Sequence, residues 1–145
     1  MNQIELLGTD LKSDFIIDLL ETYDAEVIYD FDRMHEGTPD TYRTSIPKLG
    51  LEFVFNEEQK LRTLFIRPVE IETWNPFDEK GIIEFPSKFE ALDHAKKSGI
   101  KIKEGKAKFM AEDKDWIKFE YETYGIHYEF VDASLKMITL QTNQA

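Results

Sequence analysis

The sequence GIHYEFVDASLKMITL, from Gly125 to Leu140, has a counterpart earlier in the chain, GLEFVFNEEQKLRTLFI, from Gly50 to Ile66. Both stretches read glycine, aliphatic, any residue, aromatic, any residue and phenylalanine, followed by a short polar segment. Each then continues with leucine, a basic residue and further mainly apolar residues. Alternating apolar positions on both sides of a polar turn predict two antiparallel strands. The sequence therefore predicts the same type of β-hairpin twice.

The spacing between equivalent positions stays nearly constant well outside the two hairpins. A helix start, the strand before the hairpin, the glycine and the return strand recur after 74, 74, 75 and 74 residues. This regularity predicts a tandem duplication of a helix-then-strands unit of about 70 residues. The alternative is that two unrelated hairpins use similar strand chemistry. The equivalent pairs are Ser13 and Ser87, Tyr42 and Trp116, Gly50 and Gly125, and Leu61 and Leu135.

Two segments carry helix signals. Residues 13–23 place apolar side chains at helical spacing after a capping residue, Ser13. Ser87 and Glu90 form a capping box, and the helix that they begin is expected to stop at Gly99. Strands are expected at residues 26–31, 42–46, 51–55, 61–66, 116–121, 126–130 and 135–140.

Each unit alone would bury little surface, whereas two units side by side share one sheet and one layer of helices. We therefore expect an α+β fold in which two tandem helix-plus-antiparallel-strand repeats share one sheet, with the helices on one face. Residues 1–145 are expected to form a single domain, with repeats at about 1–73 and 77–145. The connector is expected near residues 72–81, where Asn75-Pro76 disfavours a helix.

The charge balance limits the classes of partner. The 145 residues include 29 acids and 18 bases, for a net charge of −11. Such a surface disfavours binding to nucleic acid or to an anionic membrane. The chain contains no cysteine, which excludes disulfides and thiolate metal sites. With neither a signal-peptide pattern nor a long apolar segment, the sequence favours a cytosolic, soluble protein.

Acidic residues are concentrated near the N-terminus. Residues 14–40 contain nine acids, and Arg33 is their only base, which gives this tract a charge of −8. Three acids at positions i, i+4 and i+7 of the first helix share one face and repel one another. A basic partner would explain a surface kept at this cost, and an ordinary solvated surface is the alternative. The acids of the tract are Asp14, Asp18, Glu21, Asp24, Glu26, Asp30, Asp32, Glu36 and Asp40.

A lysine-rich segment follows the second helix. KKSGIKIKEGKAKF, residues 96–109, alternates lysine with apolar residues and predicts a short edge hairpin. Lysines on an edge discourage sheets from aggregating, and we favour this role over a phosphate or nucleic-acid site. Trp74, within WNPF, is either a plug over the core or an interface anchor.

The sequence contains no pattern that indicates catalysis or a cofactor. DFDRMHE, residues 30–36, combines three carboxylates with one histidine, but the spacing matches no known metal-binding loop. Nothing in the sequence pairs His94 or His127 with a nucleophile, and no nucleophile elbow is present. We therefore expect a protein that is not an enzyme and that needs neither metal nor cofactor.

Three strand motifs of the second half resemble a known group of proteins. WIKFEY (116–121), YGIHYEF (124–130) and LKMITL (135–140), together with LGLEFVFNEEQKLRTLFI in the first half, resemble immunity proteins of bacterial polymorphic and contact-dependent growth-inhibition toxin systems. They are also similar to pesticin-type immunity proteins. The tandem layout resembles that of the β-lactamase-inhibitor protein, in which two helix-plus-sheet repeats form one concave sheet.

The resemblance implies stoichiometric inhibition of a cognate toxin in the cytosol. A basic toxin, such as a nuclease, would suit the acidic surface. The expected partner-binding residues are Asp14, Asp18, Glu21, Tyr23, Asp24, Tyr29, Asp30, Asp32 and Trp74. The alternatives are a small-ligand-binding or enzymatic domain that uses the concave face of the sheet, and a generic adaptor.

Overall fold

A computed structural model describes residues 3–32, 34–68, 82–109 and 112–143. The expected connector at 72–81, with Trp74, lies outside these residues. Within these residues, the first half contains two α-helices, a short 3₁₀ helix (η1) and four strands, and the second half contains one helix and four strands. The elements are α1 (Gln3–Leu6), α2 (Asp14–Thr22), β1 (Val27–Asp30), β2 (Thr41–Ile46), η1 (Pro47–Leu49), β3 (Leu51–Phe55), β4 (Leu61–Ile66), α3 (Lys88–Ser98), β5 (Lys101–Phe109), β6 (Glu112–Glu120), β7 (Tyr124–Val131) and β8 (Ser134–Thr142).

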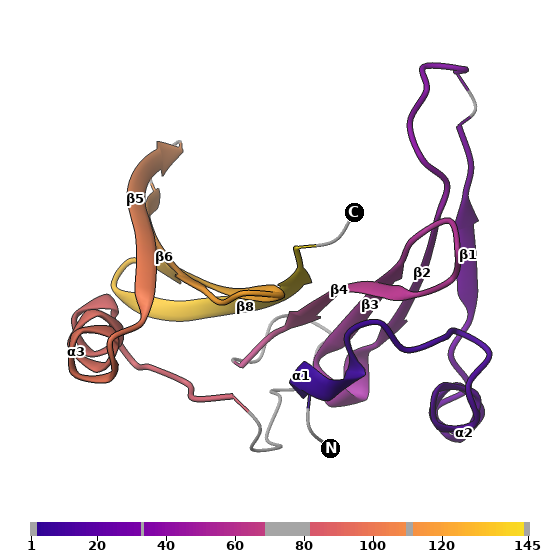
Figure 1. The fold of residues 1–145 in the computed structure, drawn as a ribbon, viewed down its shortest axis with the longest axis horizontal. Helices are drawn as coiled ribbons and strands as arrows, with labels where there is room; N and C mark the ends of the chain where they lie inside the picture. Colours follow the sequence, from indigo (N-terminus) through magenta and orange to yellow (C-terminus); the bar gives the residue numbers. More distant parts are fainter. Residues whose placement is uncertain (1–2, 33, 69–81, 110–111, 144–145) are drawn as a thin grey trace.

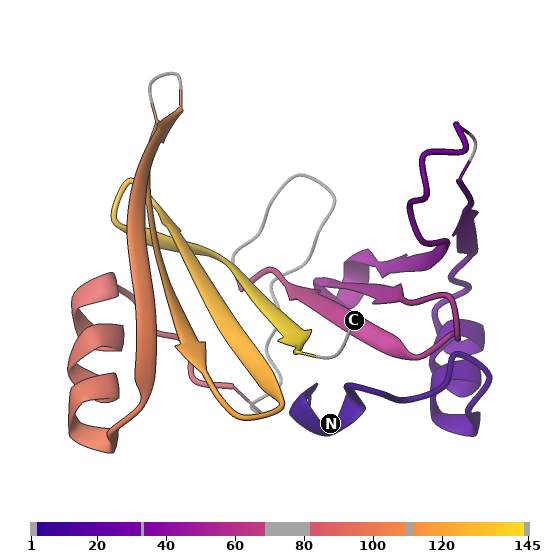
Figure 2. The same ribbon diagram turned by 45° about the horizontal axis from the view of Figure 1, so that its top comes forward.

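All eight strands belong to one antiparallel sheet, in the order β1-β2-β3-β4-β8-β7-β6-β5 (Figure 1). The expected α+β class is confirmed. Each half of the chain contributes four neighbouring strands, and the halves meet where β4 pairs with β8. β1 and β5 are therefore the two edges of the sheet. The β1–β2 arm and the β5–β6 hairpin project from its opposite ends (Figures 1 and 2).

α2 and α3 begin directly after the capping residues that the sequence predicts, Ser13 and Ser87. The Ser13 hydroxyl accepts a hydrogen bond from the Ile16 amide, and the Ser87 hydroxyl accepts one from the Glu90 amide at 3.3 Å. α3 ends at Gly99, whose left-handed conformation (φ +67°) is accessible to glycine at low cost. The ends of these two helices thus follow from local sequence.

Both repeated hairpins form, and each contains a register shift whose extra residue lies in the second strand, Arg62 in β4 and Lys136 in β8. The shift lies between Val54 and Phe55 in β3, and between Glu129 and Phe130 in β7. Such irregularities bend a strand and increase its twist. The β7–β8 turn places two consecutive residues, Asp132 and Ala133, at positive φ, as tight hairpin turns require.

One buried apolar cluster runs through both halves. It extends from Ile16 in α2, through β3 and β4, to β8, β7 and the buried face of α3. Leu64 and Ile138, on the two strands that join the halves, are 0% and 1% exposed. Burial of this kind contributes roughly 25 cal/mol per Å² of apolar area and is the main force holding the halves together.

From Lys101 onwards the lysine-rich segment is one strand, β5, and a hairpin formed within residues 96–109 is wrong. β5 pairs continuously with β6 from Lys101 to Phe109, passing straight through Gly105. Gly105 does not form a turn; it leaves room for the Trp116 ring of the neighbouring strand. A Cβ at this position would lie 2.7 Å from the Trp116 indole nitrogen. The sheet-edge position expected for this segment is confirmed.

Candidate partner-binding surface

Exposed large hydrophobic side chains gather at the β1 end of the molecule. Among the described residues, seven of the nine lie between positions 15 and 34, and the other two are Ile83 and Phe89. The same stretch carries most of the acidic tract. We call the described residues 14–36 the α2–β1 surface. Its exposed hydrophobic residues are Phe15, Ile17, Val27, Ile28, Tyr29, Phe31 and Met34.

α2 divides its side chains between the core and solvent. Ile16 is 1% exposed and belongs to the core, whereas Asp14, Asp18 and Glu21 are all exposed. Their spacing places them on the solvent side of the helix, as the sequence predicts. Tyr23, by contrast, is half-buried and packs against the core. It supports the end of α2 and offers a partner only part of its ring.

β1 is a short edge strand with an apolar and aromatic character. It pairs only with β2, and its other edge faces no strand among the described residues. Tyr29 stacks on Tyr42 with ring centroids 5.0 Å apart, and Phe31 lies 5.8 Å from Tyr29. Tyr29 and Phe31 nevertheless remain 47% and 50% exposed. The free edge and these rings together form a surface suited to a protein partner.

Two carboxylates of the acidic tract shape the loop between β1 and β2. Asp32 accepts hydrogen bonds from the amides of Glu36 and Gly37, which hold the pKa of its carboxyl below the usual range. Asp40 accepts from the Asp32 amide and from the Tyr29 hydroxyl. The hydrogen bond to Asp40 raises the pKa of Tyr29 to about 12. The carboxylates of Asp32 and Asp40 thus hold the loop in place and are already engaged within the protein.

The other acids that we expected to bind a partner differ in whether their carboxylates are already engaged within the protein. Asp30 forms an ion pair with Arg43, Oδ2 to Nε 2.8 Å apart. Asp24, just after α2, adopts a positive φ of 50° and is exposed. Within the described part of the chain, no hydrogen bond or ion pair engages the carboxylates of Asp14, Asp18, Glu21, Asp24 and Glu26.

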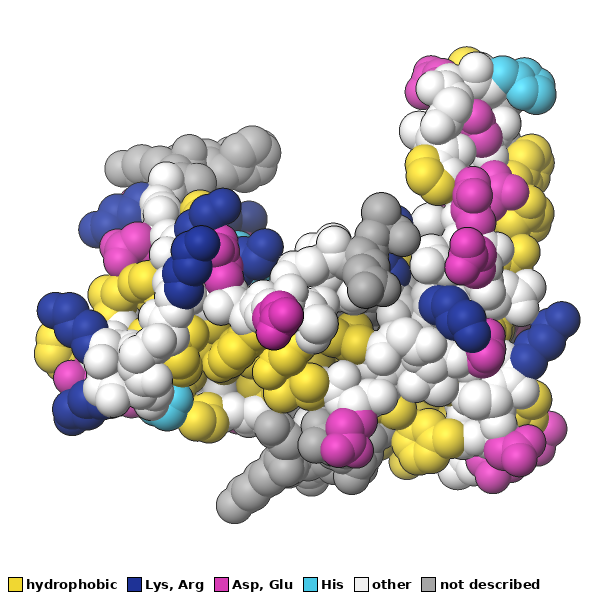
Figure 3. Space-filling model, in the orientation of Figure 1, with side chains coloured by type: hydrophobic (Ala, Val, Ile, Leu, Met, Phe, Trp, Pro, Cys, Tyr) yellow, Lys and Arg dark blue, Asp and Glu magenta, His cyan; other side chains and the backbone are white. Residues whose placement is uncertain are grey.

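Charge is separated between the two ends of the molecule. On the face seen in Figure 3, acidic side chains follow the β1–β2 arm, and basic side chains cluster over β5 and β6. A hollow of about 390 Å³ lies beside the α2–β1 surface, where α2 leads into β1. Its lining includes Tyr23, Glu26, Ile28, Arg43 and Glu52. The hollow is an apolar and charged recess rather than an enclosed ligand cavity.

The histidines and carboxylates of the described residues form no metal-binding group. No three His, Asp or Glu side chains of the described residues are grouped to hold a metal ion, including those within 30–36. His127 stacks on Trp116 at 5.3 Å, and burial lowers the pKa of its imidazole. Nearby Glu129 raises that pKa and Lys118 lowers it. Within the described ranges, no helix is both long and apolar enough to cross a membrane.

Comparison with known proteins adds no relative: no protein-family model, curated protein or solved structure matches the chain.

The structure brings most of the expected residues to one end of the sheet, with Trp74 outside the described residues. Sequence reasoning did not identify Phe15, Ile28, Phe31 and Met34. Their exposure follows from β1 being an edge strand, and that position depends on the strand order of the whole sheet. The sequence does carry one signal of this surface, the run VIYDF at residues 27–31, in which every residue except one acid is apolar or aromatic.

Proposed function

We propose that this protein is a non-enzymatic binding protein that holds a basic protein partner at the α2–β1 surface. The observation that carries the proposal is the coincidence of seven exposed hydrophobic side chains with five unengaged carboxylates at a free sheet edge. Large exposed apolar patches on a soluble chain mark interaction sites. The carboxylates select a basic partner, and the aromatic side chains supply the buried contact area.

The partner that we propose is a toxin, which the protein neutralises by stoichiometric binding in the cytosol. The support is the resemblance of the strand motifs to immunity proteins and the acidic character of the α2–β1 surface. A toxin that acts on nucleic acid carries a basic cleft, in which carboxylates take the place of phosphates. Long-range attraction would also speed association.

We further infer that the chain is a tandem duplication whose two helices cover the same face of the sheet. The support is the pairing of β4 with β8. Phe65 pairs with Thr139, and Thr139 is the position that corresponds to Phe65 in the second repeat, 74 residues later. Leu64 pairs with Leu140, the equivalent of Ile66, and Ile66 pairs with Ile138, the equivalent of Leu64.

This pairing pattern is that of a self-complementary two-fold contact between like units. The register shifts of β3 and β7 also lie at equivalent positions, 75 residues apart. Ile16 of α2 and Ala91 of α3 both reach the shared apolar cluster, which supports a common layer of helices.

The test is co-expression with the product of the neighbouring gene, scoring cell survival and co-purification together. We expect rescue and a stable one-to-one complex. The triple variant Asp14→Asn, Asp18→Asn and Glu21→Gln should associate more slowly and with a weaker dependence on salt.

A control variant neutralises three exposed acids elsewhere, Asp113→Asn, Glu122→Gln and Asp132→Asn, and so changes the net charge equally. Equal association rates for both triple variants at low salt would contradict the assigned surface. Absence of both rescue and complex would contradict the toxin-binding function.

A further inference from the structure

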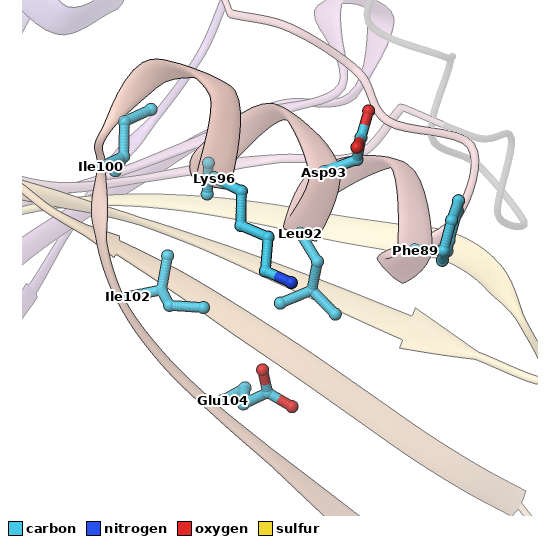
Figure 4. Close-up of a pocket in the computed structure, with 8 residues that line it drawn as sticks. Phe89, Leu92, Asp93, Lys96, Ile100, Ile102 and Glu104 are labelled. Carbon is cyan, nitrogen blue, oxygen red and sulfur yellow. The ribbon is translucent and has the colours of Figure 1, made fainter.

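A groove at the other end of the sheet separates α3 from the edge strand β5. Its volume is about 390 Å³. Leu92 of α3 and Ile102 of β5 face each other across it, and the side chain of Lys96 extends between them (Figure 4). Phe89 lies at one end and is 77% exposed.

The charges inside this groove leave one cation unengaged. Asp93 pairs with Lys97, Oδ2 to Nζ 2.9 Å apart, and Glu104 pairs with Lys88 at 3.4 Å. Both carboxylates of the groove are thus neutralised by lysines of α3. Lys96 makes no hydrogen bond or ion pair within the described part of the chain. The groove therefore presents an apolar floor crossed by an uncompensated positive charge.

The backbone beside the groove is also available. β5 spans nine residues and pairs only with β6, so that its outer edge faces no strand among the described residues. Lys101 and Lys103 share a single acid, Glu120, at 3.7 and 3.3 Å. Residues 88–106 contain six lysines and three acids, a charge of +3. This segment is basic, whereas the chain as a whole is strongly acidic.

We propose that the groove between α3 and β5 binds an extended acidic segment of a partner protein, which adds to the sheet as a ninth strand. The segment pairs its backbone with the outer edge of β5 and places an apolar side chain between Leu92 and Ile102. An acidic side chain beside it meets Lys96, and acids on the other face meet Lys101 and Lys103. This surface is distinct from the α2–β1 surface and does not depend on the function proposed for it.

The test is a titration of the isotope-labelled full chain, followed by NMR, with the eight-residue peptide DVDDDVDD, in which valine and aspartate alternate on one face of the strand and aspartates fill the other face. We expect saturable shifts at the amides of β5 and at the methyl groups of Leu92 and Ile102. The basic peptide KVKKKVKK, with the same pattern, should produce none. Lys96→Glu and Phe89→Ser should each weaken binding about tenfold, because one loses the charge contact and the other an apolar wall.

Two matched controls alter the same residue types elsewhere. Lys136→Glu changes an exposed lysine of β8, and Phe15→Ser removes an exposed phenylalanine of α2. Both should leave peptide affinity unchanged. All four variants change exposed side chains, and their native amide spectra confirm folding before the titration.

Three results would overturn the proposal. The first is the absence of saturable shifts, and the second is equal binding of the basic peptide. The third is self-association of the unliganded chain in sedimentation experiments that Lys96→Glu abolishes, because the occupant would then be a second copy. The tests do not involve the toxin, and their failure leaves the α2–β1 surface unaffected.

Discussion

Removing the Tyr128 hydroxyl tests how the second half of the core is built. Tyr128 is 1% exposed, and its hydroxyl donates a hydrogen bond to the Ile83 carbonyl oxygen at 3.0 Å. Its ring packs edge-on against Phe85 and Phe119, with centroids 5.3 and 5.2 Å away. Tyr128→Phe keeps the ring and loses only the hydrogen bond. Because Ile83 is 52% exposed, water partly replaces the donor, and we expect a cost of about 1 kcal/mol near pH 8.

The same variant has a characteristic dependence on pH. Burial raises the pKa of the Tyr128 hydroxyl, and nearby Tyr121 adds to the effect. The unfolded chain loses this proton near pH 10, whereas the folded chain keeps it to higher pH. A raised pKa contributes stability that is present below pH 10 and is lost as the pH rises. The loss is about 1.4 kcal/mol per pH unit above pH 10.

The assay is urea unfolding of the wild type and Tyr128→Phe at pH 8 and at pH 11. The variant should be less stable by about 1 kcal/mol at pH 8, and the difference should vanish or reverse at pH 11. Other groups, including Tyr29, ionise equally in both proteins, and the comparison isolates Tyr128. An equal difference at both pH values would refute the reasoning, because the hydroxyl would then ionise as freely in the folded state as in the unfolded chain.

Three further predictions concern packing and charge. Gly105→Ala should destabilise by about 1–3 kcal/mol in thermal unfolding because its Cβ meets the Trp116 ring, whereas Gly125→Ala should cost less because it meets the flexible end of Lys118. Leu64→Ala and Ile138→Ala should each cost about 2–5 kcal/mol within one cooperative transition; two transitions would show independent halves. The triple variant of α2 should change stability by no more than about 0.5 kcal/mol, and a larger loss would indicate a structural role for these acids.

Short-range signals predicted the helices and hairpins because their physical causes are local. Ser13 and Ser87 cap their helices through atoms only three residues away. The repeated hairpins follow from alternation and turn chemistry, which also act over a few residues. These elements required no knowledge of the sheet.

The sequence-based predictions were wrong or incomplete where a residue's role depends on other strands of the sheet. Gly105 resembles a turn residue, yet its role is to admit Trp116 from the neighbouring strand. The short helix α1 was not anticipated. Similarly, the exposure of Ile28 follows from the place of β1 at the edge of the sheet, which local pattern cannot reveal.

The expected site was also recovered only in part. Sequence spacing placed Asp14, Asp18 and Glu21 on the solvent side of α2. It could not distinguish them from Asp32, whose carboxylate organises a loop, or from Asp30, which pairs with Arg43. Charge counting treats these acids alike, whereas their hydrogen bonds separate them into structural and available groups.

The central claim is that the partner covers the α2–β1 surface, and hydrogen exchange of the purified complex tests it most directly. The amides of residues 14–32 should exchange more slowly in the complex than in the free protein, whereas those of residues 88–106 should be unchanged. Protection confined to the second half of the sheet, with α2 and β1 exchanging as in the free protein, would contradict the account.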